Sequence, residues 1–514
     1  MQKRTKIVAT LGPASDDKKK LCKMIKAGLD VARLNFSHGD QADHRRRAET
    51  LRAAAAECGR DIGLMGDLQG PKIRIKRFEQ GSVHLDEGDS FYLDSTLDLT
   101  AGNQDGVGVA LDSLHEDVSS GDILLLNDGM ITLSVDSIDG KRIHTTVVNG
   151  GILSDHKGIN RKGGGLSAKA LTDVDRENIK LAAELDMDFL AVSFVRSGED
   201  VEEARQLFRE AGGKGVIVAK IERTEAVENI ESIIEASDVI MVARGDLGVE
   251  MGYAELTGIQ KELIQMTRSR NKVVITATQM MESMIQNPIP TRAEVSDVAN
   301  AVIDGTDAVM LSGETAVGAY PVAVIKAMSN VCIGAEKFPN QVGRMGHRVE
   351  DKFGPVDEAI AMAVMYTANH MDVKAIIALT ESGSTTRWMS RVRSDIPIYA
   401  MTPYSATSRR VVLYRGVYPV QFEILETDRD QLYAAIFETL LSKDLVEVDD
   451  LVIFTKGDLK GVSGSTNAMK ILEVKAQSLC CEAVDSAPHW RAGCSSCHCR
   501  RAGVDHSAWQ PADA

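Results

Sequence analysis

The chain lacks the features that mark membrane, nucleic-acid-binding and disulfide-rich proteins. Its 514 residues contain no apolar run long enough to cross a bilayer and no long basic run, and the net charge is −15. Only Cys22, Cys58 and Cys332 precede residue 475, which is typical of a reduced protein. Aromatic residues make up 4%, so the core is aliphatic. The N-terminus enters an apolar run too early for a signal peptide, and we expect a cytoplasmic protein. Nucleic acid and membrane are not expected partners, whereas small anionic substrates are compatible with this charge.

The chain does have a series of short apolar runs, each the length of a strand. There are eight, at residues 6–10, 31–35, 62–67, 189–193, 216–222, 239–246, 273–278 and 308–314. Their β-branched composition is typical of strands buried on both faces, and most are separated by stretches of helical periodicity. Eight such units predict an α/β fold built on a (β/α)8 TIM barrel, whose active site lies at the carboxyl ends of the strands.

Each run ends in charged, amide or hydroxyl side chains. These are Arg33, Asn35, Asp67, Lys220, Glu222, Arg244, Asp246, Thr278, Ser312 and Glu314. Because the carboxyl ends of parallel barrel strands meet at one rim, we expect these side chains to form a single active site.

The repeat is interrupted once and followed by a different pattern. Residues 70–167 alternate short apolar runs with Gly- and Asp-rich turns, which predicts an inserted all-β lid domain, a small β-barrel, at the active-site end. Residues 355–474 return to an α/β rhythm and predict an open sheet with helices on both faces. The barrel therefore comprises 1–69 and 168–340, a polar linker precedes 355, and 475–514 form a tail.

Two carboxylates at neighbouring strand ends indicate a metal site. Glu222 and Asp246 can share one divalent cation, and Mg²⁺ suits such a pair because substrate and water complete its shell. Lys220 lies two residues before Glu222, so both side chains lie on one face of the strand. An ammonium beside a metal carboxylate suits phosphoryl transfer, which depends on positioning and charge neutralisation. The alternative is a structural Lys–Glu ion pair.

Further polar groups extend this site. Arg33 favours bidentate phosphate binding, and Lys72 and Arg74 add positive charge. His38 follows Arg33 in a segment that could equally cap a surface turn.

Backbone N–H groups at Gly245 and Asp246 can hold a substrate carboxylate, and the Thr278 hydroxyl can bind it or relay a proton. Together the residues indicate metal-assisted chemistry on a small phosphorylated acid. A Mg²⁺-dependent barrel aldolase or lyase, which would need no nucleotide, is an alternative. So is a metabolite-binding protein without activity, although the intact Lys220 and Glu222 argue against it.

A second phosphate site is indicated in the C-terminal domain. Residues 380–387 follow an apolar run and open a helix, and hydroxyls, a glycine and helix N–H groups can form a phosphate cradle there. The candidate residues are Ser382, Gly383, Ser384, Thr385, Thr386 and Arg387, with residues 464–467 as a second loop beside them. Ordinary helix capping by Ser and Thr explains the same pattern.

The segments 6–15, 33–39, 66–74, 219–222, 241–250, 277–283, 290–300 and 310–315 together resemble pyruvate kinase. The resemblance covers residues 1 to about 474. It implies a barrel, a β lid after the third strand and a C-terminal α/β regulatory domain, usually in a homotetramer. It also implies transfer of a phosphoryl group from phosphoenolpyruvate to ADP, giving pyruvate and ATP in the last step of glycolysis, with Mg²⁺ or Mn²⁺.

The resemblance also implies residue roles. Glu222 and Asp246 would bind Mg²⁺. Lys220 would stabilise the phosphoryl group in transit, and Arg33 would contact the substrate phosphate. The substrate carboxylate would be held by Gly245, Asp246 and Thr278. The nucleotide phosphates would be met by Asn35, His38, Arg74 and Lys157. Water would protonate the enolate with help from Thr278, Ser312 and Glu314.

One departure concerns K⁺. Many members bind it at the positions of Asn35, Ser37, Asp67 and the carbonyl of Leu68, and carry Glu where this chain has Lys72. Leu68, Gln69 and Lys72 instead resemble the K⁺-independent branch. A tethered ammonium can supply the monovalent positive charge that K⁺ otherwise brings. We therefore expect K⁺ to be dispensable.

The resemblance also makes Ser382 to Arg387 a site for a phosphorylated effector, a pentose or hexose phosphate or AMP. The tail departs from the family. Its Cys480, Cys481 and Cys-x-x-Cys-His segment 494–498 allow a Zn²⁺ knuckle or, less well, a haem signature. Its composition favours a disordered tail without function.

Overall fold

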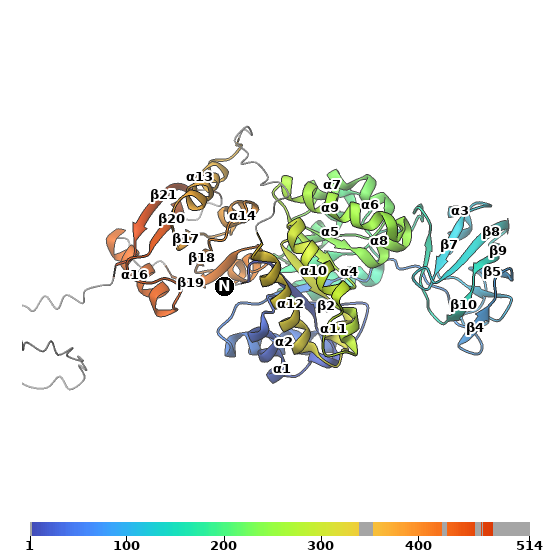
Figure 1. The fold of residues 1–514 in the computed structure, drawn as a ribbon. Coiled ribbons are helices and arrows are strands. Elements are labelled where there is room, and N and C mark those ends of the chain that lie inside the picture. Colours follow the sequence, from blue (N-terminus) through green and yellow to red (C-terminus); the bar gives the residue numbers. More distant parts are fainter. Residues whose placement is uncertain (1–2, 339–352, 424–428, 458–463, 465, 476–514) are drawn as a thin grey trace, which may run out of the picture.

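Eight parallel strands close into a barrel at the centre of the molecule, between two smaller sheet domains (Figure 1). The computed structural model describes residues 3–338, 353–423, 429–457, 464 and 466–475. The predicted tail, after residue 475, and most of the predicted linker lie outside the described residues. The barrel strands, in spatial order, are β1 (Lys6–Thr10), β16 (Ala308–Leu311), β15 (Val273–Ala277), β14 (Val239–Ala243), β13 (Val216–Ile221), β12 (Phe189–Val192), β3 (Gly63–Asp67) and β2 (Val31–Asn35). The TIM-barrel prediction is confirmed.

The barrel strands are apolar throughout because both of their faces are buried. Val8, Met65 and Phe189 fill the interior, while Ile7 and Leu34 pack outward against the helices. The surrounding helices are α1 (Lys18–Ala27), α2 (Gln41–Glu57), α4 (Asp173–Glu184), α5 (Gly198–Glu210), α6 (Thr224–Glu228), α7 (Ile230–Ala236), α8 (Arg244–Met251), α9 (Tyr253–Ser269), α10 (Arg292–Asp304), α11 (Gly313–Ala316) and α12 (Pro321–Glu336). Short 3-10 turns lie at Pro13–Ser15 and Glu282–Ile285.

The inserted segment folds as a separate body on the right of Figure 1. Its strands are β4 (Ser82–Leu85), β5 (Ser90–Asp94), β6 (Gly106–Gly108), β7 (Ile123–Leu126), β8 (Ile131–Asp139), β9 (Arg142–Asn149), β10 (Gly151–Ser154) and β11 (Ile159–Arg161), with one short helix, α3 (Leu114–Asp117). Six of them form a mixed sheet in the order β11-β7-β8-β9-β5-β6. Single bridges from Arg74 to Gly158 and from Ile75 to Val109 draw its two edges together. The sheet therefore curls toward a barrel that is closed only by isolated bridges.

The C-terminal domain, on the left of Figure 1, is an open five-stranded sheet in the order β19-β18-β17-β20-β21. The strands are β17 (Ala375–Leu379), β18 (Ile398–Thr402), β19 (Val417–Gln421), β20 (Leu451–Gly457) and β21 (Thr466–Glu473), and the helices are α13 (Val356–His370), α14 (Ser384–Arg391), α15 (Ser405–Val411) and α16 (Arg429–Ser442). Only β21 is antiparallel. One sheet face packs with α13 and α14 and the other with α16, as predicted from the α/β rhythm.

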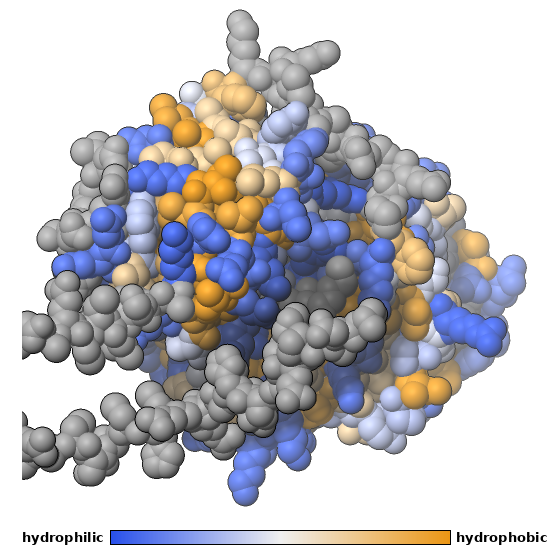
Figure 2. Space-filling model, turned by 60° about the vertical axis from the view of Figure 1, so that its left-hand side comes forward, coloured by the Kyte–Doolittle hydropathy of each residue, from blue (hydrophilic) through white to orange (hydrophobic). Residues whose placement is uncertain are grey.

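The C-terminal sheet docks against the amino-terminal end of the barrel, away from the expected active site. The Lys6 Nζ donates to the Val417 carbonyl at 2.6 Å, and Arg391 at the end of α14 forms an ion pair with Asp307 at the start of β16. Apolar surface is visible on the side where this domain comes forward in Figure 2. Within the described ranges, no helix has the length and hydropathy to span a bilayer.

Candidate active site

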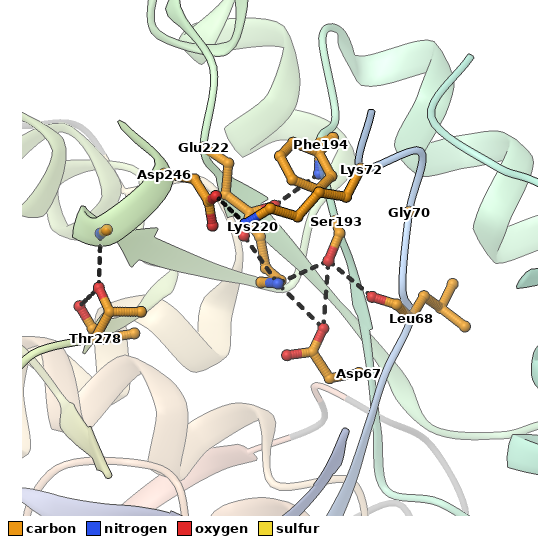
Figure 3. A network of polar contacts seen from close by, with 12 residues as sticks. Asp67, Leu68, Gly70, Lys72, Ser193, Phe194, Lys220, Glu222, Asp246 and Thr278 are labelled. Atoms are coloured by element: carbon orange, nitrogen blue, oxygen red, sulfur yellow. Dashed lines mark hydrogen bonds and ion pairs between the residues drawn. The ribbon is translucent and has the colours of Figure 1, made fainter. Parts of the chain in front are cut away.

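The polar side chains predicted from the strand ends do meet at one rim of the barrel. Figure 3 shows Asp67, Lys220, Glu222 and Asp246 converging on a common centre, with Thr278 on its far side. Asp67 and Lys220 lie on β3 and β13, Glu222 directly follows β13, Asp246 lies in the helix after β14, and Thr278 follows β15. The carboxyl ends of these four strands share this rim. The β14 strand ends earlier than its apolar run, at Ala243. Asp246 therefore lies in the first turn of α8.

Lys220 lies at the middle of this cluster and is almost fully buried. Its Nζ is 2.9 Å from Glu222 Oε1, 3.2 Å from Asp67 Oδ1 and 2.7 Å from the Ser193 Oγ. Burial alone would lower the pKa of Lys220, but the Asp67 and Glu222 carboxylates outweigh it and hold that pKa above its usual value. The ammonium is therefore a fixed positive charge at neutral pH.

Arg33 brings a second cation to the same carboxylate. Its Nε donates to Asp67 Oδ2 at 2.6 Å and one terminal nitrogen donates to the Thr10 Oγ1 at 2.9 Å. Burial tends to raise the pKa of Asp67, yet Arg33 and Lys220 keep it below its usual range. A guanidinium and an ammonium separated by one carboxylate form a rigid anion-binding arrangement.

The two proposed metal carboxylates lie beside each other but are held by different partners. Glu222 accepts from the Phe194 amide at 2.8 Å, and Asp246 accepts from the Lys72 Nζ at 2.9 Å. Burial raises the pKa of Glu222, Lys220 lowers it and Asp246 raises it again, with a net rise. Two crowded carboxylates of this kind fit one hard cation. In the described part of the chain, no group of three or more His, Cys, Asp or Glu side chains is placed to hold a metal.

Thr278 and Gly245 are brought together by their loops. The Gly245 amide donates to Thr278 Oγ1 at 2.8 Å, and that hydroxyl donates to the Ala277 carbonyl at 2.6 Å. Thr278 has a left-handed φ of 67°, which is rare for a β-branched residue. Arg244 holds this turn by donating to the Thr278 carbonyl at 2.7 Å. A hydroxyl on a strained backbone, fixed at the N-terminus of α8, suits recognition of a carboxylate once it exchanges these partners for the ligand.

Ser312 and Glu314 lie beside the loop that follows Thr278, outside the Lys220 cluster. Glu314 accepts from the Ser312 amide at 2.6 Å and from the Met281 amide at 3.1 Å, and burial raises its pKa. Among the described contacts, no hydrogen bond joins either residue to Lys220 or Thr278. Glu314 instead braces the loop that follows Thr278.

The predicted nucleotide residues form two pairs. The His38 amide donates to the Asn35 carbonyl at 3.2 Å, and the His38 side chain is exposed. Arg74 and Lys157 lie on adjoining segments, because Arg74 bridges Gly158 and donates to the His156 carbonyl at 2.9 Å. No contact among the described residues joins the two pairs.

The predicted monovalent-cation positions are partly engaged. The Asn35 Oδ1 accepts from the Ser37 amide at 3.1 Å, and the Leu68 carbonyl accepts from the Ser193 Oγ at 2.8 Å. The Lys72 Nζ reaches Asp246 and, at 3.7 Å, Asp128 of the lid. Among the described residues, no hydrogen bond or ion pair joins the Lys72 Nζ to any of the four cation positions.

Comparison with known proteins identifies the same family that the sequence motifs resemble. The model "Pyruvate kinase, barrel domain" matches residues 2–325, and "Pyruvate kinase, alpha/beta domain" matches residues 358–472. The chain belongs to the pyruvate kinase family. The Salmonella typhimurium "Pyruvate kinase II" is 52% identical over 92% of this chain and 99% of the relative.

Two further pyruvate kinases give a similar picture. The one from Haemophilus influenzae is 51% identical over 88% of this chain and 96% of its own, and the one from Geobacillus stearothermophilus is 43% identical over 92% and 80%. The resemblance to the pyruvate kinase family is confirmed, whereas the K⁺-independent branch stays a prediction. The chain is therefore a phosphotransferase, and the family implies phosphoenolpyruvate and ADP as its substrates.

The predicted effector loop opens α14. Gly383 has a left-handed φ of 82°, and its amide donates to the Thr380 Oγ1 at 2.9 Å. The Ser384 hydroxyl donates to Asp357 of α13 at 2.8 Å, and Thr385 Oγ1 lies 2.6 Å from Thr466 Oγ1 of the second loop. The structure thus brings the two predicted loops together, although these contacts serve capping as well as they would serve a ligand.

Sequence reasoning missed two groups that hold the candidate site together. Ser193 contacts Lys220, and the Phe194 amide contacts Glu222. The only signal was that Ser193 closes an apolar run, which marked a strand end but gave no role. Main-chain donors such as the Phe194 amide leave no trace in residue type.

A third missed residue, Glu250, joins the lid to the barrel. It is buried and accepts from the Asn160 side chain of the lid at 3.1 Å and from the Thr224 amide at 3.1 Å. The Gly163 amide also donates to the Glu250 carbonyl at 3.1 Å. Burial raises the pKa of Glu250 to about 7, and the charge of Glu225 adds to the rise while Arg223 opposes it.

We expect this junction to weaken as pH rises. The folded pKa lies above the unfolded value, so the stabilisation is complete below about pH 4.5 and is lost as pH rises through about 7. When the pH is raised from 5 to 8, the free energy of unfolding of the Glu250→Gln variant should therefore rise by roughly 2 kcal/mol relative to that of the parent protein. Melting curves of both proteins at the two pH values test this, with exposed Glu228→Gln as the control. A difference that does not change with pH would contradict it.

Proposed function

We propose that the chain catalyses Mg²⁺-dependent transfer of the phosphoryl group from phosphoenolpyruvate to ADP. The observation that carries the proposal is the Lys220 Nζ held 2.9 Å from Glu222 and 3.2 Å from Asp67, beside Asp246. Glu222 and Asp246 would hold the metal, which supplies charge neutralisation when bound. Their crowded, partly desolvated carboxylates fit that role, and Mn²⁺ would fit the same oxygens.

Each residue of the site would have a role that follows from its position. Arg33 and Lys220 would bind the phosphoryl group from two sides and neutralise the charge that develops on it. Gly245, Asp246 and Thr278 would hold the carboxylate. Thr278 would guide the proton that water delivers to the enolate.

Ser312 and Glu314 would support that protonation by fixing the Thr278 loop, since Glu314 holds the Met281 amide. The nucleotide phosphates would be met by Asn35, His38, Arg74 and Lys157, two pairs that lie on the barrel and on the lid entry.

The direct test is ATP formation from phosphoenolpyruvate and ADP with Mg²⁺, first in Na⁺ or Tris buffer and then with K⁺. Turnover in either buffer supports the proposal. Absence of turnover in both would favour the lyase alternative, which needs no nucleotide.

We also propose that K⁺ is dispensable, with Lys72 as the reason. The Lys72 side chain is 26% exposed, and burial would lower its pKa, but Asp246 holds that pKa above its usual value. A permanent monovalent charge therefore lies at the rim. Rates with and without K⁺ should agree within about twofold in the parent protein. Lys72→Glu should lose most activity in K⁺-free buffer and regain it with K⁺, whereas Lys76→Glu in the lid should leave the K⁺ response unchanged. If the parent protein turns over only when K⁺ is present, Lys72 does not replace K⁺, but the assignment as a phosphotransferase stands.

Finally, we propose that residues 382–387 bind a phosphorylated effector and that the protein is a homotetramer. The supporting observations are the left-handed Gly383 at the start of α14 and the second loop packed beside it. Exposed Val356 and Tyr366 on α13 offer an apolar surface for self-association. Ribose 5-phosphate or AMP should lower the phosphoenolpyruvate KM several-fold, with fructose 1,6-bisphosphate as the hexose comparison. Unchanged kinetics with all three would remove the effector proposal, and light scattering measures the assembly.

A further inference from the structure

The turn after β12 contacts Lys220 of β13 and Glu222, which directly follows that strand. Ser193 Oγ accepts from the Lys220 Nζ at 2.7 Å and donates to the Leu68 carbonyl at 2.8 Å. A hydroxyl has one hydrogen to donate, and the Asp67 Oδ1 lies farther from it, at 3.4 Å. The bond to Leu68 therefore fixes the hydroxyl with its lone pairs toward Lys220.

The next residue completes the turn with a main-chain donor. The Phe194 amide donates to Glu222 Oε2 at 2.8 Å, and Phe194 has a left-handed φ of 55°. A bulky aromatic residue in this region costs of order 1 kcal/mol or more, so the surrounding structure must impose it. The strained backbone aims the amide at Glu222.

The surroundings that impose this conformation are close-packed. A Cβ built on Gly70 would lie 2.8 Å from the Ser193 Cβ and 2.8 Å from the Phe194 ring, so the loop leaving β3 presses directly on the turn. The Arg223 guanidinium lies 5.4 Å from the Phe194 ring centroid. Ser193 is 1% exposed and has no freedom to choose other partners.

We propose that Ser193 is a positioning residue for phosphoryl transfer, because its hydroxyl sets the direction of the Lys220 ammonium. An ammonium has three hydrogens, and here they face Asp67, Glu222 and Ser193. The carboxylates attract by charge from many directions, whereas the hydroxyl accepts along a defined one. Without the Ser193 hydroxyl, the Lys220 Nζ would lie between the two carboxylates and would be poorly directed toward the phosphoryl group. The inference rests on the proposed function and concerns its rate.

The test compares Ser193→Ala with Ser193→Thr, which keeps the hydroxyl. Ser237→Ala is the matched control, because that buried hydroxyl donates only to the Ile233 carbonyl, at 2.6 Å, on the outside of the barrel. Ser193→Ala should reduce kcat roughly 10- to 100-fold with the phosphoenolpyruvate KM changed less than about threefold, since a displaced catalytic group affects the transition state more than binding. Ser193→Thr should recover most of the rate.

Two measurements separate positioning from a general loss of structure. Mn²⁺ binding without substrate, followed by electron paramagnetic resonance, should be unchanged in Ser193→Ala, because Phe194 still holds Glu222. The melting temperature should fall no further than in Ser237→Ala.

The inference is overturned if Ser193→Ala keeps kcat within about twofold, or if its rate loss comes with weaker Mn²⁺ binding and a lower melting temperature than the control. Equal loss in Ser193→Ala and in a normally melting Ser193→Thr would also overturn it. No turnover in the parent protein would instead reject the proposed function.

Discussion

Lys220→Met is expected to lower kcat for phosphoenolpyruvate-dependent ATP formation by at least about 10³-fold while the barrel stays folded. The ammonium is the buried cation with no substitute at the centre of the rim, and removing a charge of this kind from a phosphoryl-transfer site costs about 10³- to 10⁵-fold. Arg33 remains in place but is already committed to Asp67 and Thr10. Methionine matches the length of the lysine stem, so packing around β13 is preserved.

The stability of Lys220→Met should fall by only about 1 to 3 kcal/mol, because neither remaining carboxylate keeps an unbalanced charge. Asp67 retains Arg33, and Glu222, whose pKa burial already raises, can take up a proton. Circular dichroism and urea unfolding check the fold, and a coupled assay checks the rate. Lys76→Met is the control, since that Nζ reaches only the Ser95 and Leu97 carbonyls at 2.9 and 2.7 Å in the lid. Near-normal turnover of Lys220→Met would refute the assigned role.

The barrel could be predicted from the sequence because its signals are local. A strand buried on both faces needs a short apolar run, and each of the eight runs matches an observed strand to within a few residues at its carboxyl end. The largest differences are in the runs 239–246 and 308–314, whose strands end at Ala243 and Leu311 because the helices α8 and α11 follow. The rim residues followed from the strand ends, since barrel closure brings those ends together.

Contacts between segments far apart could not be predicted in this way. Glu250 and Asn160 meet across 90 positions, and neither lies in a periodic pattern that points to the other. The roles of Ser193 and of the Phe194 amide depend on the distance to β13, which periodicity does not give. For Ser382 to Arg387 the sequence allowed a ligand site and a helix cap, and the contacts of the loop serve both.

The remaining large effect concerns the barrel–C-terminal contact. Arg391→Met should destabilise the protein by about 3 kcal/mol, because breaking a buried ion pair strands its partner. The Arg391 guanidinium meets Asp307 with two nitrogens, at 2.8 and 2.5 Å, and the Lys272 carbonyl at 2.6 Å. Asp307 also accepts from the Val274 amide at 2.9 Å, so the pair ties α14 to the start of β15 as well as β16.

The cost of Arg391→Met should exceed that of Arg393→Met, which leaves no buried charge behind because Arg393 reaches only the Ile303 carbonyl, at 2.7 Å. Calorimetric melting of both variants measures the difference. Asp307→Asn should be at least as damaging. Burial and the charge of Arg391 lower the pKa of Arg268 to about 9, and Asp307 is the anion that counteracts this repulsion between cations. The double variant Arg391→Met with Asp307→Asn should then lose less than the two single losses added together, because neither charge is left unpaired. Strict additivity would mean that the two side chains stabilise the contact independently and that the ion pair does not couple the domains.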